Sequence, residues 1–471
     1  MGNLRTTPNS PAFQRGRLIP LRIRRWCFSL LLLAVTAEII LPAQVGSPNG
    51  QANSPGQKSA APPSTQAPKL TTSKPAQPVA VPAGPPPVPV KTEIGQLHGA
   101  SFRIDVPQNN WNHNLVMYYH GYESKPRVFA EVEGQPRPPS RILQQILNRG
   151  YAVAESGYSA GGWAVEYAFK ETEELREYFN KRYGKPKETL VMGHSMGGLL
   201  TVMTLEQRPE NYAGGLALCG VLAPTDLVMQ RAFANRVAFD AFFPGVLPEV
   251  DHIPSTFMMN DVPVITNVQK ALDAKPDSAA LIRSLADIHT NRGLADVLVF
   301  NTFVIEDLRL KTGGNPFDNR NLIYTGTTDD YTLNTQVKRY AADPRAVRYM
   351  SSFYTPMGAL KRKLLAVHTT YDPLVPAATA AYYDEATRRS GVGDLFVQKY
   401  VNRDGHCNIT ADQTGEVFDE LTRWIDKSQR PQPGLLAETP AEAAEPHPPT
   451  PLKSPPEPQP KSPPKNVGRP Q

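Results

Sequence analysis

The pentapeptide Gly-His-Ser-Met-Gly at residues 193–197 decides how the middle of this chain is interpreted. It follows residues 188–192, a short apolar run that predicts a strand, and precedes residues 198–206, whose spacing predicts a helix. A serine held on a sharp strand-to-helix turn needs neighbours without side chains two positions away, because the helix and the adjacent strand leave no room for a Cβ atom. Gly193 and Gly197 meet this need, so the context indicates a nucleophilic Ser195.

Outward from this turn, short apolar runs alternate with helical patterns. We predict strands at residues 93–97, 101–106, 114–119, 151–155, 188–192, 215–219, 364–368 and 396–401, and helices at 140–147, 165–183, 198–206, 377–389 and 415–427. This alternation predicts an α/β fold with a mostly parallel sheet and helices on both faces. Residues 221–362 show helical periods without a strand series, so we expect an inserted, mainly helical cap there.

The two ends of the chain differ in composition from its middle. Of the 48 prolines, 12 lie in residues 44–95 and 14 in residues 430–471. Such segments cannot bury enough apolar surface to offset the loss of chain entropy, so we predict a disordered linker at 44–95 and a disordered, lysine-containing tail at 430–471. The folded domain is then expected at residues 96–429. Weak contact of the Pro-rich segments with a cell envelope is the alternative to a plain spacer.

Residues 1–43 have the pattern of an export signal. Five arginines between residues 15 and 25 precede an apolar run at residues 26–41, which ends in small residues. We therefore expect a signal peptide and a secreted, periplasmic or cell-envelope location. A retained membrane anchor is the alternative interpretation of the same run.

Charge, cysteine count and motifs exclude several classes of protein. The 50 Lys and Arg residues against 44 Asp and Glu give a net charge of +6, an imbalance too mild to call for nucleic acid as a partner. Three cysteines leave at most one disulfide in the folded domain, which rules out a disulfide-stapled scaffold. No metal-binding or phosphate-loop pattern occurs, so we expect neither a metal nor another cofactor. The oligomeric state is not indicated.

The middle of the chain resembles the α/β-hydrolase superfamily, in its serine esterase and lipase branch. The resemblance covers residues 96–429 and rests first on the turn at Ser195 and on the sequence Tyr-His-Gly-Tyr at residues 119–122, which is similar to the family's His-Gly loop. It implies an oxyanion hole formed by the backbone N–H groups of Tyr122 and Met196.

The resemblance also implies the two partners of the serine. Asp372 follows the predicted strand at residues 364–368 in an Asp-x-x-Val-Pro run, and His406 lies on the loop after the strand at 396–401. The order Ser195, Asp372, His406 is that of the family. Asp226 matches a minority arrangement of the family and stays open as the alternative acid, whereas Asp404 is expected to stabilise a turn.

Cys219 and Cys407 are similar in placement to a feature of tannases and fungal-type feruloyl esterases. In those enzymes a disulfide joins residues adjacent to the catalytic serine and histidine. Here position 194 is His rather than Cys, so the resemblance is partial, and a disulfide between Cys219 and Cys407 and a pair of separate thiols both remain open.

Residues on loops at the strand ends or beside Ser195 are the candidates for a substrate pocket, because ligands bind there in such sheets. They are His120, Tyr122, Tyr158, Trp163 and His194. In the cap, aromatic and methionine residues such as Phe239, Phe243 and Met258 are candidates for an apolar wall above the serine. The acidic residues Glu249, Asp251 and Asp261 would be needed if the substrate were a peptide amine.

Together these observations predict an exported serine hydrolase that cleaves carboxylic esters of small molecules through a Ser-His-Asp triad. A serine peptidase or amidase of the same fold is the first alternative. A non-catalytic cell-surface binding protein that kept the fold is the second, and the complete set of triad residues disfavours it.

Overall fold

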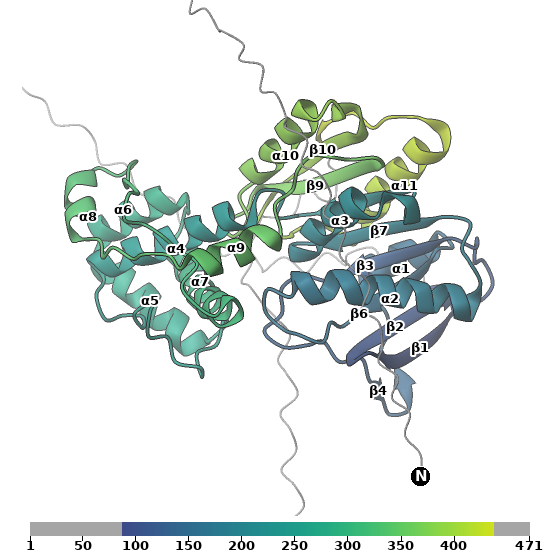
Figure 1. Cartoon of the computed structure of the whole chain (residues 1–471), viewed down its shortest axis with the longest axis horizontal. Coiled ribbons are helices and arrows are strands. Elements are labelled where there is room, and N and C mark those ends of the chain that lie inside the picture. The colour runs from purple at the N-terminus through teal and green to yellow at the C-terminus, as the bar shows by residue number, and fades with distance from the viewer. Residues whose placement is uncertain (1–86, 438–471) are drawn as a thin grey trace, which may run out of the picture. The chain divides into compact units, whose positions relative to one another are not determined.

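The computed structural model describes residues 87–437. The predicted export signal, most of the predicted linker and most of the predicted tail lie outside these residues. The described part contains eleven strands: β1 Val90–Leu97, β2 Ala100–Pro107, β3 Leu115–Tyr119, β4 Glu131–Val132, β5 Gln135–Pro136, β6 Ala152–Ser156, β7 Thr189–His194, β8 Gly214–Leu218, β9 Lys363–Tyr371, β10 Phe396–Asp404 and β11 Gly434–Leu435. Apart from the small β4–β5 hairpin, these strands form one sheet (Figure 1).

The strand order of the large sheet is β1-β2-β6-β3-β7-β8-β9-β10-β11. The β1–β2 and β2–β6 pairs are antiparallel, and every later pair from β6–β3 onward is parallel. The carboxyl ends of β3, β7, β8, β9 and β10 therefore meet at one edge of the sheet, which is where this class of sheet binds ligands. The second strand, β2, is antiparallel to its neighbours, and β6 lies between β2 and β3 in the sheet. Together with the parallel strands that follow, this is the topology of the α/β-hydrolase fold.

Strand β3 shows why the sheet must be covered on both faces. Its five residues are all buried and alternate between two apolar clusters: Leu115, Met117 and Tyr119 belong to one, and Val116 and Tyr118 to the other. Because successive side chains of a strand point to opposite faces, each cluster needs its own layer of helices.

Two layers of helices supply this cover. The first cluster packs against α2 Val165–Tyr183, α3 Met196–Gln207 and α10 Ala378–Arg389, and the second packs against α1 Arg141–Asn148 and α11 Ala411–Lys427. Figure 1 shows α2 and α3 on one side of the sheet, and α1 on the other. The predicted α/β architecture with helices on both faces is confirmed.

The segment between β8 and β9 forms the cap. It contains six helices, α4 Thr225–Phe242, α5 Val262–Ala274, α6 Pro276–Ala286, α7 Asn291–Thr312, α8 Asp330–Gln336 and α9 Pro344–Ser352. In Figure 1 helices α4 to α8 form a group of their own beside the sheet. Helix α4 was not predicted, because it is buried on several sides and its apolar residues follow no single stripe.

The structure changes the predicted boundaries of the folded domain at both ends. Strand β1 begins at Val90, inside the predicted linker, and pairs along its whole length with β2. Strand β11 lies inside the predicted tail and pairs with β10 through Lys399 and Tyr400. Residues 90–92 and the two residues of β11 are each too short to show an apolar alternation, so their backbone pairing leaves little trace in the sequence pattern.

A buried carboxyl group ties the end of the cap to the nucleophile helix. Glu206 of α3 is 9% exposed and accepts hydrogen bonds from the hydroxyl groups of Tyr354 and Tyr383 and from the backbone N–H groups of Met357 and Ala359. Four donors replace the water that this group loses on burial, so the return from α9 to β9 is fixed to α3.

Among residues 87–437, no helix is both long enough and apolar enough to span a membrane.

Candidate active site

Ser195 lies on the turn between β7 and α3 in a backbone conformation that few residues other than glycine adopt, with φ 57° and ψ −121°. Its N–H group donates a hydrogen bond of 2.9 Å to the carbonyl oxygen of Leu218 in β8. A Cβ atom on Gly197 would lie 2.1 Å from the carbonyl oxygen of Tyr119, and one on Gly193 would lie 2.3 Å from that of Gly197. The two glycines are therefore sterically required.

Hydrogen bonds connect Ser195, His406 and Asp372 in a line. Nε2 of His406 lies 2.8 Å from Oγ of Ser195, and Nδ1 of His406 lies 2.7 Å from Oδ2 of Asp372. His406 follows β10 and Asp372 follows β9, so both reach the serine from the carboxyl edge of the sheet. With the proton on Nδ1, Nε2 is free to accept the serine proton.

Asp372 is held as an anion behind the imidazole. Its side chain is fully buried, and Oδ1 accepts hydrogen bonds of 2.9 Å from the backbone N–H groups of Leu374 and Val375. Burial alone would raise the pKa of the Asp372 carboxyl, but the charges and hydrogen bonds of His406 and His368 outweigh it and hold the pKa far below its usual range. No sequence pattern pointed to His368, whose Nε2 lies 3.4 Å from Oδ2 of Asp372.

The alternative acids lie elsewhere. Asp226 is exposed in the first turn of α4, where its carboxyl accepts the N–H of Leu227. Asp404 is the last residue of β10 and is also exposed. Neither has a hydrogen bond to His406, so the structure favours Asp372 over both.

The predicted oxyanion loop lies beside the nucleophile. A Cβ atom on Gly121 would lie 3.2 Å from Cβ of Ser195. The backbone of Gly121 is therefore close to the serine, and Tyr122 is the next residue. Tyr122 and Met196 both line the same cavity as Ser195. Within residues 87–437, neither backbone N–H donates a hydrogen bond to another group, so both donors are free for an oxyanion.

His194 supports this loop and does not line the cavity, contrary to its predicted place in the substrate pocket. Its Nε2 accepts a hydrogen bond of 3.2 Å from the N–H of Gly121, and its Nδ1 lies 2.7 Å from the hydroxyl of Tyr118. Burial, with smaller contributions from Arg127 and His406, lowers the pKa of His194 to about 3. The ring is therefore neutral and braces the oxyanion loop from behind.

His120 and Tyr158 are also supporting residues and do not line the cavity. Their rings stack with centroids 3.9 Å apart, and both are almost fully buried. Nδ1 of His120 bonds the carbonyl oxygen of Gly121, while the hydroxyl of Tyr158 donates to the carbonyl oxygen of His120. Their polar atoms thus bind the loop's own backbone, and substrate contact by either residue stays a prediction.

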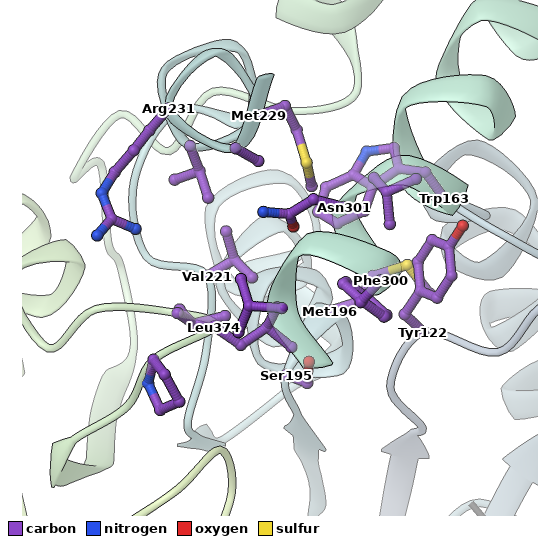
Figure 2. A pocket seen from close by; sticks show the side chains of 16 residues that line it. Tyr122, Trp163, Ser195, Met196, Val221, Met229, Arg231, Phe300, Asn301 and Leu374 are labelled. Atoms are coloured by element: carbon purple, nitrogen blue, oxygen red, sulfur yellow. The ribbon is translucent and has the colours of Figure 1, made fainter. Parts of the chain in front are cut away.

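Trp163 and Tyr122 are the predicted pocket residues that do line the cavity. The cavity has a volume of about 50 Å³, enough for only a few water molecules, so lining side chains must move to admit an acyl group. Figure 2 shows it between the sheet edge and the cap. It is lined by Tyr122, Trp163, Ser195, Met196, Val221, Val228, Met229, Arg231, Ala232, Val297, Phe300, Asn301, Val304, Pro373, Leu374 and Val375.

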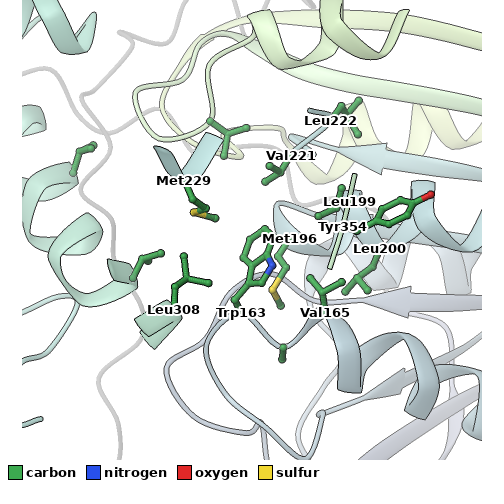
Figure 3. Packing of buried hydrophobic residues seen from close by; sticks show 14 of the residues in the cluster. Trp163, Val165, Met196, Leu199, Leu200, Val221, Leu222, Met229, Leu308 and Tyr354 are labelled. Atoms are coloured by element: carbon green, nitrogen blue, oxygen red, sulfur yellow. The ribbon is translucent and has the colours of Figure 1, made fainter. Parts of the chain in front are cut away.

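The cap contributes different residues to this wall from those expected. Phe239 and Phe243 stack on each other in the interior of the cap, and Met258 is 55% exposed. The wall instead comes from α4 and α7. In Figure 3 Met229 of α4 and Leu308 of α7 lie on the cap side of Trp163, with Met196 on its other side.

The two cysteines that were left open form a disulfide. Cys219 directly follows β8, Cys407 directly follows His406, and their Cα atoms are 5.2 Å apart, a normal separation for the bond. The loop that carries the base is thereby fixed to the strand beside the nucleophile. The partial resemblance to tannases and feruloyl esterases stays a prediction.

Asp307 of α7 joins the cap to the oxyanion loop, and no sequence signal pointed to it. Its Oδ2 accepts hydrogen bonds from the hydroxyl of Tyr122 at 3.0 Å and from the backbone N–H of Trp163 at 2.8 Å. Lys311, one turn later, lies 3.2 Å from Oδ1. A Cβ atom on Gly162 would lie 2.1 Å from this carboxyl group, and Gly162 has φ of 71°, so only glycine fits there. The cap therefore contacts the site at the residue that supplies an oxyanion donor.

The sheet topology, the turn at Ser195 and the hydrogen-bonded Ser-His-Asp line together define a class. The chain is a serine hydrolase with the α/β-hydrolase fold.

The comparisons with known proteins are as follows. Residues 173–239 match the model of the prolyl oligopeptidase family, peptidase S9. The o-phthalyl amidase of Xanthobacter agilis is 21% identical over 415 residues, which cover 72% of this chain and 88% of the amidase.

Among solved structures, the acylaminoacyl peptidase of Pyrococcus horikoshii has a TM-score of 0.39 at 10% identity, with 72% of this chain covered. An esterase of Aspergillus oryzae has a TM-score of 0.39 at 11% identity, with 70% of this chain and 78% of the esterase covered. The chain spans 42% of the length of the peptidase.

Substitutions in the line of hydrogen bonds should rank by role. We expect Ser195→Ala to lower kcat by about 10⁶-fold and Asp372→Asn by about 10⁴-fold, because the first removes the nucleophile and the second the anion that orients the imidazole. Steady-state kinetics on an activated ester would measure both. Asp226→Asn is the control and should stay near the wild-type rate; a large loss there with little effect of Asp372→Asn would reverse the assignment of the acid.

Substitution of Asp307 should affect turnover more than substrate binding. Without its carboxyl group Tyr122 loses its anchor in the cap, and we expect Asp307→Ala to lower kcat by about 10-fold with a smaller change in KM. Glu306→Gln, on the neighbouring position of α7, is the matched control because Glu306 pairs with Arg309 instead. A fall in Tm with kcat unchanged would mean that Asp307 holds the cap without influencing the oxyanion hole.

Proposed function

We propose that this protein hydrolyses carboxylic esters of small molecules through a covalent acyl-enzyme. The observation that carries the proposal is the line of hydrogen bonds Ser195–His406–Asp372, with bond lengths of 2.8 and 2.7 Å, beside two free backbone N–H groups. This arrangement supplies a nucleophile, a base and donors for a developing oxyanion in one place.

Each step of the reaction can be assigned to a group in the site. Oγ of Ser195 attacks the carbonyl carbon while Nε2 of His406 takes the serine proton, and the carbonyl oxygen becomes an oxyanion that the N–H groups of Tyr122 and Met196 stabilise. His406 then gives the proton to the leaving alkoxide, and an alcohol departs. Water, deprotonated by His406, attacks the acyl-enzyme in the same way and releases the acid and free Ser195.

The cavity beside Ser195 favours a small or aryl apolar group next to the scissile bond. Most of its lining is aliphatic or aromatic, with Met229 and Phe300 from the cap facing Trp163 and Leu374 from the sheet edge. Burial of apolar substrate surface against such a wall supplies binding energy of about 25 cal/mol per Å². Its small volume argues against long acyl chains.

An amidase is the second candidate, favoured by the similarity to the o-phthalyl amidase over 72% of this chain. The same site geometry serves both reactions, because amide cleavage requires only that His406 protonate an amine instead of an alkoxide. The N-terminal amine of a peptide, however, meets no carboxylate among the described residues that line the cavity. Glu249 and Asp251 bind Lys338 at 2.5 and 3.4 Å, and Asp261 accepts the N–H of Val264 as the N-cap of α5.

Matched substrates test the proposal. The substrates are p-nitrophenyl esters with acyl groups from acetate to palmitate. We expect the full chain to hydrolyse those with short or aryl acyl groups fastest, because the cavity is small and apolar. The p-nitroanilide of the best acyl group should be cleaved more slowly than its ester. Release of p-nitrophenol and p-nitroaniline would be followed by absorbance, with Ser195→Ala as the blank.

The outcomes separate the hypotheses. Faster cleavage of the anilide than of the ester would replace the esterase by the amidase. Ester turnover that persists in Ser195→Ala would contradict the assigned nucleophile. No turnover on either series would favour the non-catalytic binding protein.

We also propose that the protein is exported. Support comes from the disulfide Cys219–Cys407, because such bonds persist in oxidising compartments, together with the signal pattern predicted at residues 1–43. In the natural host the protein should be found outside the cytoplasm. Alkylation of the unfolded, unreduced protein should label neither Cys219 nor Cys407 until a reductant is added; immediate labelling of both, or recovery in the cytoplasmic fraction, would contradict export.

A further inference from the structure

The cavity beside Ser195 contains one feature that the hydrolysis mechanism does not use. Among the described residues that line it, Arg231 is the only one with a formal charge. In Figure 2, Arg231 of α4 lies at the left of the cavity, and Trp163 and Tyr122 lie at the right. Asn301 of α7 lies between these two sides. A cation in an otherwise apolar binding cavity is costly unless it meets an anion.

In the part of the chain that the structure describes, no carboxylate forms an ion pair with Arg231, and Asp287 acts on it only from beyond ion-pair distance. Arg231 has no carboxyl oxygen within 4.0 Å, and its one hydrogen bond runs from Nη2 to the carbonyl oxygen of Ala286, 2.6 Å away at the end of α6. Nε and Nη1 make none. Burial lowers the pKa of Arg231, and Asp287 only partly offsets this.

Another arginine on the same helix does have a carboxylate partner. Arg236 forms an ion pair with Asp240 and donates hydrogen bonds to Oγ1 of Thr302 at 2.8 Å and to the carbonyl oxygen of Pro248 at 2.5 Å. The cap thus supplies a carboxylate for Arg236 in its interior but none for Arg231 at the cavity.

A second polar group in the cavity also lacks a partner. Asn301 is only 5% exposed, and its side-chain amide makes no hydrogen bond to any residue between 87 and 437. Buried amides are nearly always hydrogen-bonded in folded proteins. An amide without a hydrogen bond and a guanidinium with two nitrogens free of hydrogen bonds line one cavity, and together they indicate a ligand group that accepts hydrogen bonds and carries negative charge.

We propose that Arg231 and Asn301 form a subsite for a carboxylate of the substrate, remote from the scissile carbonyl. The inference rests on the proposed function, because it concerns the same cavity, and it narrows the substrate class to monoesters or monoamides that keep a second, free carboxylate. The apolar lining between Ser195 and Arg231 then holds the ring or chain that separates the two groups.

A carboxylate fits this subsite better than a phosphate does. With Nη2 partly used by Ala286, one edge of the guanidinium remains for two parallel hydrogen bonds, which matches the two oxygens of a carboxylate. A phosphate monoester would bring up to two negative charges into a cavity whose lining offers a single cation. The excess charge would be buried without a partner.

Pairs of substrates that differ only in this charge test the proposal. One pair is the p-nitrophenyl monoester of terephthalic acid and the same ester with the second carboxyl methylated. The other is p-carboxyphenyl butyrate and its methyl ester, which places the charge on the leaving group. We expect the wild-type protein to prefer the charged member of at least one pair in kcat/KM.

Variants of Arg231 then assign the preference. In Arg231→Gln, kcat/KM for the preferred charged substrate should fall about 10- to 100-fold while the methylated partner changes less than about 3-fold, as for a lost charge-assisted hydrogen bond. Arg231→Lys should keep part of the preference. Asn301→Leu should reduce it by a smaller factor, because it removes a neutral donor only.

The outcomes also separate this inference from the proposed esterase function. An equal loss on charged and methylated substrates in Arg231→Gln would overturn the subsite and leave Arg231 as a cap of helix α6. So would a wild-type protein without charge preference in either pair. In both cases hydrolysis of the neutral esters, absent in Ser195→Ala, would still support the esterase.

Discussion

The close approach of two backbone segments at Ser195 is the constraint on which the site depends. A Cβ atom on Gly197 of α3 would lie 2.1 Å from the carbonyl oxygen of Tyr119 in β3. The two backbones therefore meet without a side chain between them. This contact lets Ser195 keep its unfavourable φ of 57° and places the N–H of Tyr122 beside it. The base and the acid need only be added from the neighbouring strands.

The parts of the site that could be predicted from sequence are those set by local chemistry. The glycines two positions before and after Ser195 indicate a turn with no room for side chains there. The strand before this turn and the helix after it set the direction of the chain. Once the sheet is known to be parallel, residues after separate strands share one edge. That is why Asp372 and His406, 34 residues apart, could be placed beside Ser195.

The parts that could not be predicted depend on contacts between distant segments. Asp307 lies 185 residues from Tyr122 and inside a long helix, where an acidic residue usually faces water, so nothing in its surroundings signals a buried partner. The orientation of His194 could not be predicted for a related reason. A residue next to the nucleophile can face either the cavity or the back of the oxyanion loop, and only the position of Tyr118 and Gly121 decides between them.

The arrangement divides the chemistry from the choice of substrate. Ser195, His406 and Asp372 all follow strands of the sheet, and the disulfide fixes the loop of His406 to the end of β8, so the reacting groups share one rigid edge. The wall opposite them, with its unpaired polar groups, comes from helices α4 and α7 of the cap. Changes in these two helices can alter the charge and shape of the cavity without moving the triad. Because Asp307 also belongs to α7, the helix that lines the cavity is also the one that holds Tyr122 of the predicted oxyanion loop through a hydrogen bond.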